Sequence, residues 1–323
     1  MAEALNGKLV TVFGGSGFIG RHVVRALARQ GWRIRVAVRR PDLAGFLQPL
    51  GVVGQIQPIQ ANLRYRGSVD RAVENADAVV NLVGILAESG RQSFEAVQSF
   101  GARAVAEAAR AAGITNVVHG SAIGADPASP SLYGRTKAAG EAAMLAAVPG
   151  AVILRPSIVF GPEDDFFNRF AAMARMMPIL PVVGPDTRFQ PVFVGDVAAA
   201  AALAVNGGCR PGTVYELGGP EVKTFRQCLE LVNAETDRTR PIVAIPFPIA
   251  RLQARLMSLM PNPPLTVDQV RLLERDNVVS DAARAEGRTL EGLGLTATSL
   301  AAILPTYLWT YRPHGQFEPR RAG

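Results

Sequence analysis

The stretch VTVFGGSGFIGRHVV, residues 10–24, places four glycines within seven positions, between an apolar run and a helical pattern. Gly15, Gly17 and Gly20 fit the spacing GxGxxG, and Gly14 with the last two fits GxxGxxG. Glycines at these places allow a tight turn and let backbone N–H groups approach a pyrophosphate, and the start of the following helix adds partial positive charge. The alternative is a turn that only packs the helix against a sheet. We predict a dinucleotide site held by Gly14, Gly15, Ser16, Gly17, Phe18, Ile19 and Gly20.

Around this stretch, apolar strand patterns alternate with helical patterns throughout the first half of the chain. Such alternation predicts an α/β fold with a doubly wound parallel sheet, of the Rossmann type. The expected strands are 8–14, 33–38, 54–60, 77–84, 115–122 and 151–156, and the expected helices are 17–30, 92–112 and 132–147.

The rhythm changes after Pro156. A helix is expected at 163–177 and a strand at 212–219, and beyond them helical patterns are separated by Pro-rich connectors such as residues 241–248. We therefore expect a nucleotide-binding domain over 1–220 and a smaller, mostly helical domain over 221–323.

Composition limits the classes of protein that fit. The chain has 323 residues, is 48% hydrophobic and carries a net charge of +7, with only three lysines among its 34 basic residues. This arginine bias reflects either coding bias or a surface for anionic partners. No basic block exceeds two residues and aromatic side chains do not interleave, so nucleic-acid binding ranks last.

Other features concern metals and compartment. The two cysteines form no CxxC, and the three histidines are scattered, so we expect reduced thiols and no metal site. No signal peptide is evident at the N-terminus, and the apolar run 197–205 is too short to span a bilayer. The expectation is a soluble protein that is still able to lie on a membrane.

The end of the second expected strand bears on which dinucleotide is preferred. NAD sites place a carboxylate roughly 20 residues after the glycines, where it binds the ribose 2′-hydroxyl. Here Arg39 and Arg40 stand at that place, and the first acid is Asp42. Because guanidinium groups pair bidentately with phosphate, we predict NADP(H) in preference to NAD(H). The alternative is two solvated arginines.

Tyr133 and Lys137 are spaced i and i+4 on an expected helix, so they share one face. A phenol so placed exchanges a proton with a carbonyl, and the ammonium lowers the phenol pKa and hydrogen-bonds the nicotinamide ribose. Ser121, and secondly Ser131, are candidates to hold the carbonyl oxygen. The other reading is an ancestral catalytic pair that is kept only for cofactor binding.

These motifs resemble the short-chain dehydrogenase/reductase superfamily in its extended or atypical branch. The resemblance rests on GGSGFIG, NLVG at 81–84, Ser121 and YGRTK, and it spans residues 8–160. Asn62 stands where that family has an adenine-binding aspartate, and an asparagine can still hydrogen-bond an amino group. The resemblance implies cofactor contacts from Asn62, Leu63, Val83, Gly84 and Pro156 in addition to Tyr133 and Lys137.

A closer resemblance lies outside the catalytic motifs. The segments TRFQPVFVGDVAAAA, LLERDNVVS at 272–280 and LPTYLWTYRPHGQF are similar to the nucleotide-binding accessory subunit of respiratory complex I in its alphaproteobacterial form. This resemblance implies a structural subunit that binds NADP(H) tightly. It would lie peripherally on the cytoplasmic side of the respiratory membrane, with other complex I subunits as partners. Because Tyr133 and Lys137 are present, an active NADP-dependent oxidoreductase or epimerase acting on a hydrophobic carbonyl or a quinone stays open.

Residues 245–264 form an amphipathic stretch, IPFPIARLQARLMSLMPNPP, in which leucines and methionines accompany Arg251 and Arg255. Such a helix fits an acidic lipid surface or a groove in a partner protein. The alternative is a core helix of the smaller domain.

Overall fold

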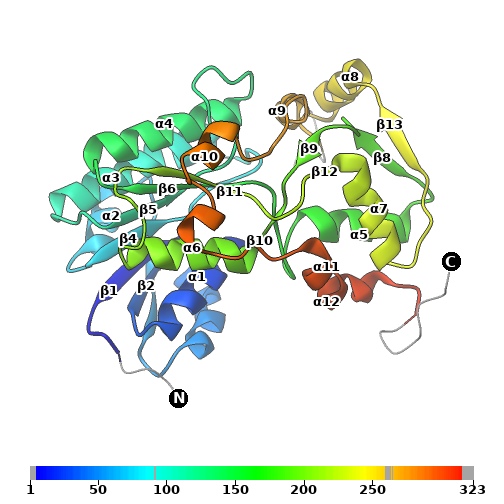
Figure 1. The fold of residues 1–323 in the computed structure, drawn as a ribbon. Helices are drawn as coiled ribbons and strands as arrows, with labels where there is room; N and C mark the ends of the chain where they lie inside the picture. Colours follow the sequence, from blue (N-terminus) through cyan, green and yellow to red (C-terminus); the bar gives the residue numbers. More distant parts are fainter. Residues whose placement is uncertain (1–4, 91, 259–262, 264, 315–323) are drawn as a thin grey trace. The chain divides into compact units, whose positions relative to one another are not determined.

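A computed structural model describes residues 5–90, 92–258, 263 and 265–314. The chain forms two compact units, each assembled from three segments (Figure 1). The sheet unit comprises Met1–Pro156, Gly195–Leu217 and Ser280–Leu295, and the second unit comprises Ser157–Val194, Gly218–Val279 and Thr296–Gly323.

This division differs from the single boundary that we expected near residue 220. The chain leaves the sheet unit after Pro156 and returns to add one further strand. It returns again after Val279, where the Ser280 N–H donates to the Glu216 carboxylate at 2.7 Å. Local composition does not reveal such returns, because they depend on pairing between segments far apart in the chain.

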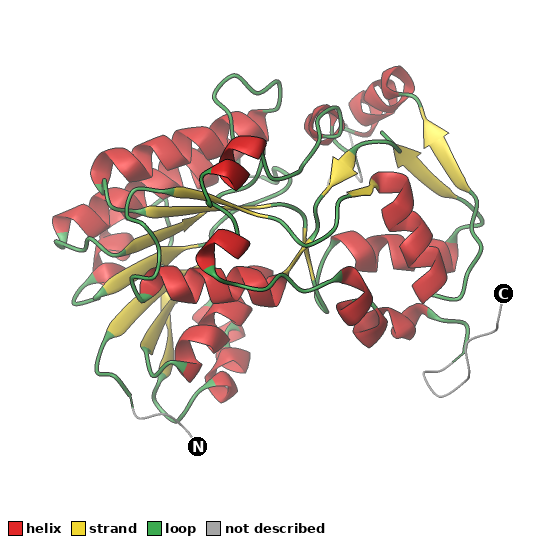
Figure 2. Cartoon of the chain, in the orientation of Figure 1, coloured by secondary structure: helices red, strands yellow, loops and turns green. Residues whose placement is uncertain are grey.

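The sheet unit contains a seven-stranded parallel sheet in the order β11-β6-β5-β4-β1-β2-β3, which confirms the doubly wound fold (Figure 2). The connection direction reverses between β1 and β4, and ligands of such folds bind at the carboxyl ends of the strands near that reversal. The strands are β1 (Leu9–Phe13), β2 (Arg33–Val38), β3 (Ile56–Gln60), β4 (Ala78–Asn81), β5 (Val117–Gly120), β6 (Val152–Pro156) and β11 (Val214–Leu217).

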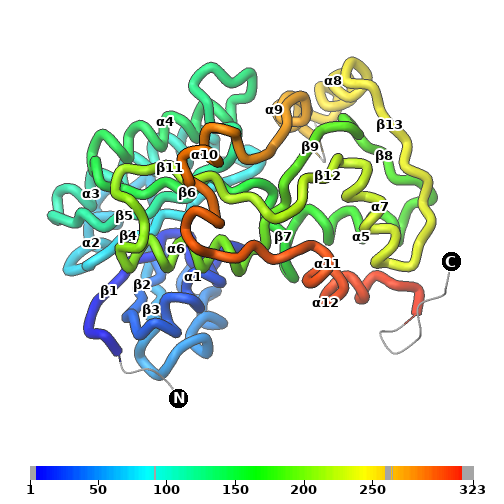
Figure 3. The backbone as a smooth tube through the Cα atoms, in the orientation of Figure 1, coloured from blue at the N-terminus to red at the C-terminus, as the bar shows by residue number. Residues whose placement is uncertain are grey.

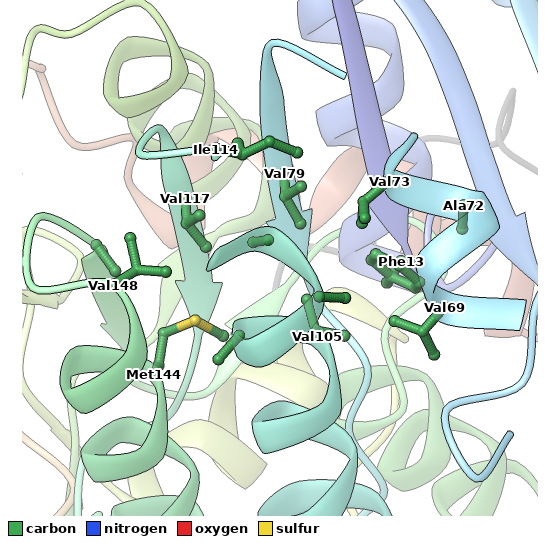
Figure 4. Close-up of a cluster of buried hydrophobic side chains, with 14 of the residues drawn as sticks. Phe13, Val69, Ala72, Val73, Val79, Val105, Ile114, Val117, Met144 and Val148 are labelled. Carbon is green, nitrogen blue, oxygen red and sulfur yellow. The ribbon is translucent and has the colours of Figure 1, made fainter. Parts of the chain in front are cut away.

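Successive residues of each strand point to opposite faces of the sheet, and helices cover both faces. Phe13 points into a core that also includes Val105 and Met144 (Figure 4). Ala37 of β2 belongs to the same core. The alternate positions Val12 and Val36 are buried too, as expected for a parallel sheet covered on both faces. The main helices of this unit are α1 (Phe18–Arg29), α2 (Arg66–Val73), α3 (Phe100–Ala111), α4 (Leu132–Ala147), α6 (Val194–Val205) and α10 (Asp281–Ala285).

The helix expected at 92–112 is divided into two parts. Residues Glu95–Ser99 form a π-helical turn, and α3 begins directly after it. The turn packs against α4, where Gly140 lets the two backbones approach: a Cβ at Gly140 would meet the carbonyl oxygen of Gln98 at 2.4 Å. Such π-turns occur frequently at functional sites.

The second unit is built around α5 (Phe166–Met176) and α7 (Phe225–Glu235), which are labelled in Figure 3. The buried apolar residues of these two helices belong to one core cluster. The expected connector at 241–248 instead forms strand β13 (Ile242–Ile245), which pairs in parallel with β8 (Leu180–Val183). The remaining elements are β7 (Val159–Phe160), β9 (Arg188–Phe189), β10 (Val192–Phe193), β12 (Lys223–Thr224), α8 (Phe247–Met257), α9 (Val267–Leu272), α11 (Leu300–Ile303) and α12 (Pro305–Leu308). Among the described residues, no helix has the length and apolar character that crossing a bilayer requires.

Candidate functional site

The glycine loop joins β1 to α1 at the carboxyl end of the sheet. Gly14 has φ +77°, a conformation that L side chains rarely adopt. A Cβ at Gly14 would lie 3.1 Å from the carbonyl carbon of Leu82, and a Cβ at Gly20 would lie only 2.2 Å from the oxygen of Gly14. The loop is therefore folded too tightly for side chains at these two positions.

The start of α1 has the features of an anion site. Gly17 occupies the N-cap position, no side chain caps the helix, and the first turn contains no acidic residue. The first N–H groups of a helix have no acceptor within the helix itself, and here they face a position without a competing side-chain oxygen. The residues present fit a dinucleotide pyrophosphate.

The two arginines after β2 differ in their surroundings. Arg40 is exposed and forms a bidentate pair with Asp42, with nitrogen–oxygen distances of 3.1 and 2.8 Å. Arg39 is also exposed and has no ion pair within the described part of the chain. Of the two arginines, Arg39 is therefore the one whose guanidinium is not engaged by a carboxylate of the described residues.

Asn62 and Leu63 follow β3. The Asn62 side-chain oxygen accepts from the Arg64 N–H at 3.1 Å, so the adenine contact implied by the family resemblance would use the Asn62 side-chain N–H₂ group or the second lone pair of that oxygen. The Leu63 side chain packs into the core and lies against Gly101. The Leu63 side chain is therefore engaged in packing, so the cofactor contact that the family resemblance implies would have to come from its backbone.

The predicted Tyr–Lys pair lies in the first two turns of α4, close to the end of β5. The Lys137 Nζ donates to the Gly120 carbonyl oxygen at 3.2 Å and lies 5.9 Å from the centre of the Tyr133 ring. A Cβ on Gly84 would be 3.2 Å from the same nitrogen, so the absence of a side chain at Gly84 leaves room for Lys137. The fold thus brings Gly84, Gly120, Tyr133 and Lys137 together.

The two serine candidates have different partners. Ser131 is the N-cap residue of α4, and its side chain accepts from the Gly134 N–H at 3.3 Å. The Ser121 hydroxyl is buried and has no hydrogen-bond partner among the described residues. A buried hydroxyl without a partner is uncommon and suits a ligand atom, so Ser121 is the better candidate to hold a carbonyl or carboxamide oxygen.

Burial shifts the pKa values of both Tyr133 and Lys137. Desolvation lowers the pKa of Lys137 to about 8, although Glu141 one turn further along α4 opposes that shift. Desolvation also raises the pKa of Tyr133 to about 12. A neutral phenol with so high a pKa is a weak proton donor, and positive charge on Lys137 is the property that would lower it.

A polar contact that the sequence analysis did not single out supports the floor of this site. The Asn81 side chain lies 3.2 Å from the Nδ1 atom of buried His119, and its oxygen accepts from the Val83 N–H at 3.2 Å. Desolvation, together with the nearby charge of Lys137, lowers the pKa of His119 to about 3. His119 is therefore neutral and accepts the hydrogen bond from Asn81, which holds the backbone at Val83.

Of the remaining predicted residues, Pro156 ends β6 and its carbonyl oxygen accepts from the Ile123 N–H at 3.0 Å. Phe94, which was not predicted, packs edge-to-face on Tyr133 with ring centres 5.8 Å apart. It precedes the π-turn, and the apolar character of that stretch was the only sequence signal for it. Among the described residues, no group of histidine, cysteine, aspartate and glutamate is arranged to hold a metal ion.

Parallel strands ending at a glycine loop, with a Tyr–Lys pair on the helix after β5, define a nicotinamide-dinucleotide-binding protein of the short-chain dehydrogenase/reductase type. Residues 10–218 match the NAD dependent epimerase/dehydratase family, and the chain belongs to it.

Relatives extend this similarity beyond the sheet unit. The chain is 34% identical to "NADH dehydrogenase [ubiquinone] 1 alpha subcomplex subunit 9, mitochondrial" of Arabidopsis thaliana, over 97% of this chain and 80% of that protein. It is 29% identical to "NADH-ubiquinone oxidoreductase 40 kDa subunit, mitochondrial" of Neurospora crassa, over 98% of this chain and 83% of that protein.

Two further comparisons concern enzymes. The chain is 37% identical to "Ceramide reductase" of Caulobacter vibrioides, over 59% of each chain. Among solved structures, the NADPH-dependent quinone oxidoreductase QOR2 of Escherichia coli, in complex with NADPH, has a TM-score of 0.71 and 19% identity, over 93% of this chain and 98% of that one. The identity to the solved structure is low, so it shows the shared fold only.

Proposed function

We propose that this chain is an accessory subunit of respiratory complex I that holds NADP(H) as a structural ligand and does not turn it over. The observation that carries the proposal is the extent of the similarity. The match to the complex I relative covers 97% of this chain, so it includes most of the second unit, which supplies none of the predicted nucleotide contacts. Catalytic motifs alone would not produce similarity there.

The residues described above assign each part of the nucleotide a partner. The amides at the start of α1 would take the pyrophosphate, and Arg39 would take the 2′-phosphate that distinguishes NADP(H) from NAD(H). Asn62 would contact the adenine, and Lys137 the nicotinamide ribose. A bound nicotinamide supplies hydride chemistry, but in this proposal its contribution is stabilisation of the fold.

That contribution follows from linkage. A ligand that binds only the folded protein stabilises it by RT ln(1 + [L]/Kd), which is about 4 kcal/mol when the ligand concentration is a thousand times Kd. The sheet unit would then keep the conformation that its partner subunits recognise only while the nucleotide is bound.

Contact with the membrane is proposed through α8. Ile249, Leu252 and Leu256 are 50%, 60% and 63% exposed, whereas Ala250 and Ala254 on the opposite side of the helix are buried. This helix therefore presents an apolar face outward, with Arg255 and the Glu274-paired Arg251 beside it, which supports a surface contact over a core helix. Part of the predicted 245–264 stretch, residues 259–262 and 264, lies outside the described residues. We place the protein peripherally on the cytoplasmic side of the respiratory membrane.

The proposal is tested by purifying the respiratory membrane complex from cells that express a tagged copy of this chain. We expect complex I subunits to copurify, with NADP(H) in near-stoichiometric amount and no oxidation of that nucleotide upon addition of quinone. The variant Gly15→Val should lower both the nucleotide content and the amount of assembled complex. Isolation of the tagged chain free of complex I subunits would contradict the proposal.

The second candidate function is an NADP-dependent reductase acting on a hydrophobic carbonyl. It is favoured by the orphaned Ser121 hydroxyl beside the Tyr133–Lys137 pair, and by the 37% identity to a ceramide reductase over part of the chain. In that reading Ser121 orients the carbonyl oxygen, Tyr133 delivers the proton, and Lys137 lowers the phenol pKa. Consumption of NADPH with a long-chain ketone, abolished in Tyr133→Phe, would establish it.

A further inference from the structure

A group of arginines in the second unit has no role in the proposed nucleotide site. Arg175 is at the end of α5, and Arg238 and Arg240 lie between α7 and β13. The Arg175 guanidinium lies 5.8 Å from the centre of the Tyr311 ring, and an Arg238 Nη donates to the Tyr311 carbonyl at 3.2 Å. The Arg240 Nε donates to the carbonyl oxygen of Ala174 at 2.9 Å, which completes the group.

The charges of these three guanidinium groups are not balanced by carboxylates of the described residues. Within the described residues, no Asp or Glu oxygen lies within 4.0 Å of any of them. The neighbouring Glu235 is paired with Arg312 at 3.6 Å, and Asp237 is exposed with φ +57°. The partial negative charge at a helix C-terminus, about half an elementary charge per helix, balances only part of the positive charge of these arginines.

A second observation at Arg238 also indicates a missing hydrogen-bond partner. Its Nε is buried and has no hydrogen-bond acceptor among the described residues. Burial, with the neighbouring charges of Arg240 and Arg175, lowers the pKa of Arg238. Buried donors without acceptors are rare in folded proteins, so a charged one beside two like charges indicates that an anion normally lies against this group.

An exposed apolar segment adjoins the arginines. Met176, Met177 and Ile179 are 79%, 37% and 40% exposed, and they connect Arg175 to β8. The Leu180 N–H donates to the Pro241 carbonyl at 2.8 Å where β8 and β13 begin to pair, so this segment and the segment carrying Arg238 and Arg240 enter the same end of that sheet. Arginine beside exposed methionine and isoleucine is suited to a boundary between water and acyl chains.

We infer that Arg175, Arg238 and Arg240 bind the phosphate of an acidic phospholipid headgroup, while Met176, Met177 and Ile179 enter the acyl region beside it. Guanidinium forks match phosphate oxygens bidentately, and a free phosphate would leave the apolar side chains in water. The inference deepens the proposed placement at a membrane and depends on it. It is independent of the nucleotide and uses none of the residues of α8.

The test measures cosedimentation of the full-length protein with phosphatidylcholine vesicles, with and without phosphatidylglycerol. We expect binding only when the acidic lipid is present, and weaker binding as salt is added. Arg175→Gln and Arg238→Gln should each reduce the partition coefficient about fivefold. Arg238→Lys should reduce it by a smaller factor, because the positive charge is kept. The matched control is Arg29→Gln, which removes an exposed arginine of α1 in the sheet unit and should leave binding unchanged.

Other results would overturn the inference. Equal binding by the wild type and by a variant lacking both Arg175 and Arg238 would do so, provided that the two proteins melt at the same temperature. Stabilisation by inorganic phosphate that depends on Arg238, without vesicle binding, would show a soluble anion site instead. Nucleotide content and copurification of complex I subunits are measured on the same samples, so a failure of the proposed function is distinguished from a failure of the lipid site.

Discussion

The ammonium nitrogen of Lys137 lies 5.9 Å from the centre of the Tyr133 ring and donates to the Gly120 carbonyl, which closes the end of β5 against α4. Lys137 thus has a structural bond even without a ligand, while the pKa of Tyr133 is raised to about 12. In both proposed functions this arrangement would contribute to nucleotide binding, and in only one of them would it also contribute to catalysis.

Substitutions in this pair separate binding from turnover. Lys137→Met should weaken NADPH binding by about tenfold or more, because a charge-assisted hydrogen bond to the ribose is lost. Tyr133→Phe should leave the affinity within about threefold, since the ring and its packing on Phe94 are preserved. Isothermal titration of nucleotide-free protein measures both values. A large loss of affinity in Tyr133→Phe would show that the hydroxyl itself holds the nucleotide.

Because the glycine loop is tightly folded, we predict that the loss of stability caused by a Gly→Ala substitution depends strongly on its position. Gly20→Ala should destabilise the protein by about 1–3 kcal/mol and abolish NADPH retention, because the added Cβ would lie 2.2 Å from the Gly14 oxygen. Gly45→Ala is the matched control, since a Cβ there meets nothing within 4 Å. Denaturant unfolding of the two variants measures the difference. Equal stability would show that the loop relaxes freely.

The two arginines after β2 should differ in their effects. Arg39→Ala is expected to reduce NADPH affinity about tenfold or more while NADH affinity changes little, because only the 2′-phosphate is affected. Arg40→Ala should have a smaller effect, since its guanidinium is already paired with Asp42. The ratio of NADPH to NADH affinity, measured for each variant, checks this.

Asp42→Asn is the informative companion to these variants. It releases Arg40 from its ion pair, so preference for NADPH should be kept or increased. If Asp42→Asn shifted the preference toward NADPH and Arg39→Ala had no effect, Arg40 would be the phosphate ligand.

Buried His119 predicts a pH dependence of stability. Its pKa is lowered to about 3 in the folded protein, against an unfolded value near 6.5, so the unfolded state binds the extra proton between these values. The stabilisation is fully present above pH 6.5 and is lost as the pH falls, by about 1.4 kcal/mol per pH unit. Urea unfolding of the ligand-free protein between pH 7 and pH 5 measures this slope.

His119→Gln offers the control for that slope. Glutamine keeps a hydrogen-bond acceptor for Asn81 but does not titrate, so stability should change less with pH over the same range. An unchanged slope in the variant would assign the pH dependence to other groups.

The parallel sheet and most of its elements were predictable from local patterns. The expected helix 132–147 is the observed α4, and the expected strand 33–38 is the observed β2. Strands that are buried on both faces consist of continuous apolar residues, and helices have apolar residues that recur every three or four positions. Both patterns extend over a few neighbouring residues, so they can be recognised from the sequence. The spacing of Tyr133 and Lys137 was predictable for the same reason.

Elements that depend on distant partners were not predictable. The segment 242–245 contains few residues and is flanked by prolines, and it becomes a strand only because β8 lies beside it. The π-turn at 95–99 follows from the close packing of α4 at Gly140. The two returns of the chain to the sheet unit likewise depend on pairing with β6 and on contacts of Glu216.

By itself, the sequence determined a glycine-rich turn between a strand and a helix, two arginines after the second strand, and a tyrosine and a lysine on one helical face. Each of these depends on spacing along a few residues. Only the tertiary structure decided that Lys137 donates to the Gly120 carbonyl and that the Asn81 side chain hydrogen-bonds His119. It also decided that the Ser121 hydroxyl is buried with no hydrogen-bond partner in the described part of the chain. The two hydrogen bonds join residues up to 38 positions apart in the chain. They form because a buried polar group cannot bond to water and has only the partners that folding brings near it.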